Sequence, residues 1–119
     1  MVPRVLVVQP REALARTTGR VLRGAGFETT LVPDGDAAVR AAVTDPPAAV
    51  LVDLTLPVLD GWLVLSALGA RRARPRLVAY APPGDAARAL ALGADACVHD
   101  RGAAVAALRR VTAGALAPA

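Results

Sequence analysis

Two patterns of apolar and polar positions alternate along the chain. Residues 4–8, 28–32, 77–81 and 96–98 are short runs of β-branched and aliphatic residues, and residues 48–53 form a longer run of the same kind. Apolar runs of this length between Pro and Gly residues are typical of strands that are buried on both faces of a parallel sheet. The sequence therefore predicts five strands, and the run over residues 48–53 is expected to be buried on both faces.

Between these runs, apolar residues recur at the spacing of one helix face. The clearest case is residues 11–23, and further helices are expected over residues 36–43, 62–70, 85–92 and 102–115. Short connections and right-handed crossovers then make the fold a doubly wound α/β sheet of five βα units. We expect one domain over residues 1–119, with a tail that frays from about residue 116.

Composition narrows the possible functions. The net charge is +4, and all 14 basic residues are Arg. Because the Arg residues are scattered, apart from those in residues 71–76, and have no interleaved aromatic residues, direct binding of nucleic acid is not expected. The single Cys97 excludes an internal disulfide, and there is no signal-peptide pattern or long apolar segment. We expect a cytoplasmic protein without a membrane contact.

One acidic residue has a special position, because Asp53 ends the longest apolar run. A buried charge is costly unless it is paired, and open α/β sheets form their ligand crevice at the carboxyl ends of the strands. Asp53 is therefore expected at that edge of the sheet. The simpler alternative is that Asp53 caps the following loop and accepts hydrogen bonds from backbone N–H groups near Thr55 or Leu56.

The succession of motifs resembles the response regulator receiver domain. Residues 51–61 match the strand of that family that carries the phosphoacceptor, its Leu-Pro loop and its Asp-Gly turn, and residues 4–8, 33–35 and 91–95 support the match. The resemblance implies a flavodoxin-like fold with the sheet order 2-1-3-4-5. It also implies that Asp53 stands where the family has its phosphoacceptor aspartate.

The other residues expected at this site depart from the family's pattern. The paired acids that hold Mg²⁺ align with Gln9 and Pro10, so two negative charges are missing. The small hydroxyl residue that follows the fourth strand aligns with Tyr80, and the lysine that follows the fifth strand aligns with Asp100. We therefore expect no metal and no other cofactor at this site.

The charge at the fifth strand is the most consequential of these differences. A carboxylate at Asp100 would repel Asp53, which would raise a pKa or turn one of the two side chains outward. The neighbouring Arg101 would supply a substitute cation only if the loop were shifted, and Arg is not interchangeable with Lys in a tight site.

These differences favour an atypical receiver, or pseudo-receiver, that acts as an interaction module in a two-component or phosphorelay pathway and not as an enzyme. A protein partner or a second copy of the chain is expected on the face formed by the fourth helix, the fifth strand and the fifth helix. The candidate charges on that face are Arg88, Asp95, Arg109 and Arg110.

Two alternatives stay open. The chain could accept a phosphoryl group on Asp53 by an altered route. It could instead bind a nucleotide or another small ligand in the crevice between Gln9, Asp53 and Tyr80, where fewer charges leave a more neutral pocket.

Overall fold

Strands and helices alternate along residues 2–55 and 60–116, the part of the chain that the computed structural model describes. The strands are β1 (Arg4–Val8), β2 (Glu28–Val32), β3 (Ala49–Asp53), β4 (Arg76–Tyr80) and β5 (Ala96–Val98). The helices are α1 (Glu12–Gly24), α2 (Gly35–Thr44), α3 (Asp60–Gly69), α4 (Ala86–Ala91) and α5 (Arg101–Leu116), with a 3₁₀ turn, η1 (Pro83–Asp85), before α4.

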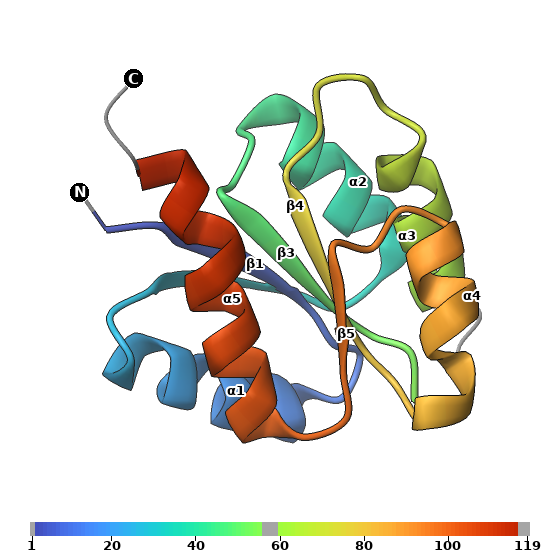
Figure 1. Cartoon of the computed structure of the whole chain (residues 1–119). Helices are drawn as coiled ribbons and strands as arrows, with labels where there is room; N and C mark the ends of the chain where they lie inside the picture. The colour runs from blue at the N-terminus through green and yellow to red at the C-terminus, as the bar shows by residue number, and fades with distance from the viewer. Residues whose placement is uncertain (1, 56–59, 117–119) are drawn as a thin grey trace.

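The five strands form one parallel sheet in the order β2-β1-β3-β4-β5. Helices α1 and α5 cover one face, and α2, α3 and α4 cover the other (Figure 1). This confirms the predicted doubly wound fold and its strand order. The residues expected to fray at the C-terminus lie mostly beyond Leu116 and so outside the described residues.

The core consists of two aliphatic layers, one on each face of the sheet. In β1, Leu6 and Val8 pack toward α2, α3 and α4, whereas Val5 and Val7 pack toward α1 and α5. Successive side chains of a strand point to opposite faces, so a strand that is covered on both faces needs apolar residues at every position. The unbroken apolar runs of the sequence follow from this arrangement.

The observed limits of the predicted elements differ from the expected ones by at most two residues, and two of these differences have a clear cause. Strand β4 begins one residue earlier than expected, because Arg76 pairs with Ala49 although its side chain is exposed. The expected helix over residues 85–92 is shorter, since η1 precedes it and Asp85 makes no side-chain capping bond. By contrast, Asp34 caps α2, with its Oδ1 accepting a hydrogen bond from the Ala37 N–H at 2.8 Å.

Two backbone segments touch where α3 ends. Gly69, the last residue of α3, lies against Leu92 and Gly93 in the turn between α4 and β5. Gly93 has a φ of +114°, and a Cβ atom on it would lie 2.8 Å from the Cα of Gly69. Only glycine permits both this φ and this approach. The contact joins α3 to the turn that leads into β5.

No helix in the part of the chain that the structure describes is both long and apolar enough to cross a membrane.

Candidate functional site

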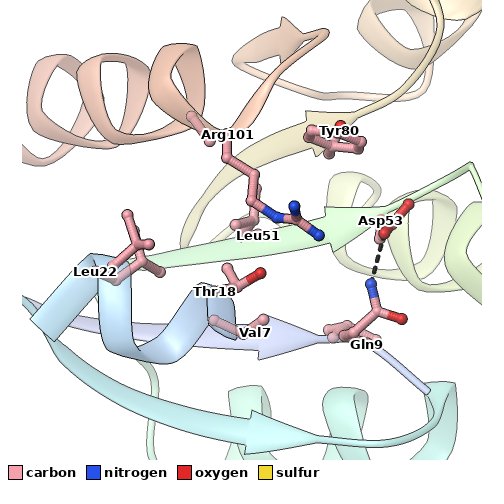
Figure 2. Close-up of a pocket in the computed structure, with 11 residues that line it drawn as sticks. Val7, Gln9, Thr18, Leu22, Leu51, Asp53, Tyr80 and Arg101 are labelled. Carbon is pink, nitrogen blue, oxygen red and sulfur yellow. Dashed lines mark hydrogen bonds between the residues drawn. The ribbon is translucent and has the colours of Figure 1, made fainter. Parts of the chain in front are cut away.

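The carboxyl ends of three neighbouring strands bring Gln9, Asp53 and Tyr80 to one edge of the sheet. Val8 pairs with Val52, so Gln9 and Asp53 follow adjacent positions of β1 and β3. Asp53 itself pairs with Tyr80 across β3 and β4. The three residues named in the sequence prediction therefore meet, as Figure 2 shows.

Both carboxylate oxygens of Asp53 accept hydrogen bonds from uncharged groups. The Nε2 of Gln9 donates to Oδ2 at 2.5 Å. The backbone N–H of Thr55 donates to Oδ1 at 2.8 Å, and the Thr55 hydroxyl donates to the same oxygen at 2.5 Å. The bond to the Thr55 backbone is the one that the loop-capping alternative predicted. Leu56, the other residue named there, lies outside the described residues.

The amide of Gln9 has a fixed orientation. Its Oε1 accepts a hydrogen bond from the backbone N–H of Arg11 at 3.1 Å, which leaves Nε2 to face Asp53. The residue is only 5% exposed. Pro10, which follows it, is exposed and has no side-chain oxygen or nitrogen. The end of β1 therefore offers Asp53 a hydrogen-bond donor, where a metal site would need an acceptor.

The residues at this site do not fit Mg²⁺, the metal that the fold family implies. Mg²⁺ requires a nearly octahedral set of oxygen ligands, usually with more than one carboxylate or phosphate. Among the described residues, Asp53 is the single carboxylate that lines the pocket here, and the guanidinium of Arg101 lines it too. Within residues 2–55 and 60–116, no group of three or more His, Cys, Asp and Glu residues is placed to hold a metal ion.

Asp100 does not face Asp53. Its Oδ1 accepts a hydrogen bond from the backbone N–H of Ala103 at 2.7 Å, in the first turn of α5. This is the geometry of an N-cap, which also places the negative charge at the positive end of the helix dipole. The carboxylate is exposed and lies outside the pocket. Of the two outcomes expected for this residue, the structure has the outward-turned side chain.

Arg101 lines the same pocket as Asp53 and Tyr80. The sequence interpretation brought this residue to the site only if the loop were shifted, and α5 does begin one residue earlier than expected. Arg101 is the first residue of α5, and its side chain extends from the helix toward the carboxyl end of β3 (Figure 2). No ion pair of 4 Å or less joins Arg101 to Asp53 among the described residues.

Tyr80 is half-buried and packs against the apolar layer of α1 and α5. Its backbone carbonyl accepts a hydrogen bond from the Leu54 N–H at 2.8 Å, which ties the end of β4 to the residue after Asp53. The Tyr80 side chain lines the same pocket as Asp53 and Arg101.

Three of the four charges proposed for an interaction face have contacts within the chain. The guanidinium of Arg88 lies over the ring of Trp62, with its central carbon 4.3 Å from the ring centre. Arg109 donates through Nη2 to the carbonyl oxygen of Ala25 at 3.3 Å, beyond the end of α1. Arg110 is exposed.

Asp95 has a structural role that sequence reasoning missed. Its carboxylate accepts hydrogen bonds from both Nη atoms of Arg74, at 3.1 and 3.3 Å, and from the Leu77 N–H at 2.8 Å. The cluster joins the start of β4 to the start of β5, at the edge of the sheet opposite Asp53. The Arg-rich stretch before β4 was the only sequence signal for it.

The Cys97 thiol does not take part in the site. Burial, and secondly the Asp85 carboxylate, raise the pKa of this half-buried thiol above its ordinary value. The side chain therefore stays a neutral thiol at pH 7 and behaves as a small apolar group.

Comparison with known proteins shows to which family a chain with this geometry is similar. The model of the response regulator receiver domain matches residues 5–109. The chain is 43% identical over 68 residues to the transcriptional regulatory protein PrrA of Mycobacterium tuberculosis, covering 57% of this chain and 29% of PrrA. It is 39% identical over 93 residues to the sensory transduction protein RegX3 of the same organism, covering 76% of this chain and 41% of RegX3. The chain thus spans less than half the length of these curated relatives.

Solved structures with the same fold include receiver domains from several bacteria. A receiver domain of a Francisella response regulator has a TM-score of 0.84 at 18% identity, covering 95% of this chain and 98% of that one. The receiver domain of a sensor histidine kinase from Pseudomonas aeruginosa, described with a magnesium ion in its active-site cleft, has a TM-score of 0.80 at 27% identity, covering 95% of this chain and 99% of that one. With its strand order, its Asp53 site and the match over residues 5–109, the chain belongs to the response regulator receiver domain family.

Proposed function

We propose that this chain is a pseudo-receiver, a signalling domain that acts through contacts with a protein partner and does not depend on Mg²⁺-assisted phosphorylation of Asp53. The observation that carries the proposal is the hydrogen bond from the Gln9 amide to Asp53 Oδ2. It places a donor where metal binding would need a second carboxylate.

The uncharged hydrogen-bond partners of Asp53 support the same conclusion. Phosphoryl transfer by a protein depends mainly on positioning and on neutralising the charge of the phosphoryl oxygens. At this site the two carboxylate oxygens are held by Gln9 and Thr55, which are both uncharged. A phosphoryl group on either oxygen would have to displace one of these bonds.

Arg101 favours a second candidate function, in which Asp53 is phosphorylated without a metal. The guanidinium lines the pocket beside Asp53 and offers planar donors that suit phosphoryl oxygens. A single guanidinium nevertheless neutralises less of the phosphoryl charge than a divalent ion together with a lysine. We therefore place this route second.

For the partner, we propose the exposed side of α4, β5 and α5, where a protein or a second copy would bind. Arg110 of α5 is exposed, and Leu90 of α4 is 50% exposed. These two residues are better contact candidates than Asp95, which binds Arg74 and the backbone of Leu77.

A metal titration tests the proposal directly. Mn²⁺ prefers the same oxygen ligands as Mg²⁺, and it broadens the NMR signals of nearby nuclei. We expect the amide signals of Gln9, Asp53 and Thr55 to show no selective, saturable broadening. The Pseudomonas aeruginosa receiver domain, whose structure has magnesium in the cleft, is the positive control. Selective broadening that disappears in Asp53→Asn would refute the proposal.

A further inference from the structure

A pocket lies between α1 and α5, next to Asp53 on the α1/α5 face of the sheet (Figure 2). Its volume is about 30 Å³. One water molecule needs roughly 10–15 Å³, so the pocket has room for more than one group of that size. It occupies the crevice outside the carboxyl ends of the strands, where open α/β sheets bind their ligands.

The floor of the pocket is apolar and buried. Val7, Leu22, Leu51 and Ala104 line it, and each is 5% exposed or less. Ala104 of α5 lines this floor, and its single methyl group occupies little space there. The floor therefore suits a short aliphatic group.

The mouth of the pocket is rich in hydrogen-bond donors. Arg101, Tyr80 and Thr18 line it, and the hydrogen bonds found among the described residues involve none of their side chains. Asp53 lines it too, but its oxygens accept bonds from Gln9 and Thr55. Hydrogen-bond donors next to an apolar floor suit a ligand that has acceptor atoms at one end and a carbon chain at the other.

We infer that this pocket binds a small aliphatic carboxylate, with its two oxygens on the guanidinium of Arg101 and its carbon chain between α1 and α5. The fork of an Arg side chain matches a carboxylate through two parallel N–H···O bonds. The bound anion would join α5 to α1 and to the end of β3, which gives the proposed pseudo-receiver an input that is independent of phosphorylation. The inference deepens the proposed function by naming what the site binds.

The test is an NMR titration of the whole chain with isobutyrate, whose branched chain and single charge suit the floor and the mouth. The neutral amide isobutyramide and inorganic phosphate are the matched controls, since the first lacks the charge and the second lacks the carbon chain. We expect isobutyrate to shift the signals of Leu22, Leu51 and Arg101 in a saturable way. Both controls should bind at least about fivefold more weakly.

Two substitutions at the mouth should act in opposite directions. Arg101→Gln removes the charge and the forked donors of this exposed side chain and leaves a shorter polar one, and should weaken isobutyrate binding roughly tenfold. Asp53→Asn removes a negative charge near the bound anion, and should tighten binding severalfold. Ala104→Val fills the floor and should weaken binding without any change in charge, once thermal unfolding shows that the variant is folded.

A titration without saturable shifts in the wild-type chain would overturn the inference. So would equal binding by Arg101→Gln or by isobutyramide. These outcomes are distinct from a failure of the proposed function, because Mn²⁺ broadening at Asp53 is measured without any carboxylate present and phosphorylation is read as a gain in mass.

Discussion

Replacing Gln9 and Pro10 together by Asp is expected to create a Mg²⁺ site in a chain whose natural residues do not form one. The donor that now faces Asp53 becomes an acceptor, and two negative charges join the one on Asp53. Oxygen ligands of this kind are what Mg²⁺ binds. Since Gln9 is only 5% exposed, the new carboxylate at residue 9 would lie beside Asp53 with little water to screen it.

The variant should therefore be less stable than the wild type without Mg²⁺ and should recover with it. Two neighbouring carboxylates repel each other, and a cation that binds only the folded state removes the repulsion. At a Mg²⁺ concentration 100 times the Kd, the added free energy of unfolding is about 2.7 kcal/mol. Thermal unfolding with and without Mg²⁺ measures this, and the wild type should show no such gain.

The matched control is the pair Gln9→Asn and Pro10→Asn, which has the size of the Asp pair without its charge. If the control gains as much stability from Mg²⁺ as the Asp variant, the missing carboxylates are not the reason that the natural site fails to fit the metal.

Gly69→Ala is expected to have the largest effect on folding. A Cβ atom at Gly69 would overlap the carbonyl oxygen of Leu92, and it would be 3.3 Å from the Cα of Gly93. These are backbone atoms, so no side chain can rotate away to make room. Overpacking that forces the backbone to move costs about 1–3 kcal/mol and occasionally more, and we expect about 3 kcal/mol here.

Urea unfolding measures this loss, and Gly24→Ala is the control. Gly24 also ends a helix, but a Cβ atom added there meets nothing within 4 Å. The control should change the free energy of unfolding by less than about 1 kcal/mol, since Ala also favours the helix. Equal effects of the two substitutions would mean that the contact between α3 and the α4–β5 turn does not constrain the fold.

The layers of the fold were predictable because each strand carries its own signal. Runs such as residues 5–8 are apolar at every position, and this pattern is typical of a strand that is covered on both faces. The start of β4 was not predictable in the same way. Arg76 is a charged residue, and it belongs to the strand because its backbone pairs with Ala49.

The residues of the site were predictable from where the strands end, but their contacts were not. Gln9, Asp53 and Tyr80 meet because parallel strands end at one edge. The orientation of Asp100 depended on a helix start one residue earlier than expected, which made it an N-cap and brought Arg101 to the pocket. The pairing of Asp95 with Arg74 joins residues 21 positions apart, and no local pattern indicates such a contact.

The proposed function requires that Asp53 does not accept a phosphoryl group with the help of Mg²⁺. Its most direct test is the intact mass of the chain after incubation with acetyl phosphate, with and without Mg²⁺. We expect the mass of the wild-type chain to be the same in both conditions. A Mg²⁺-dependent gain of one phosphoryl group, absent from Asp53→Ala, would contradict it.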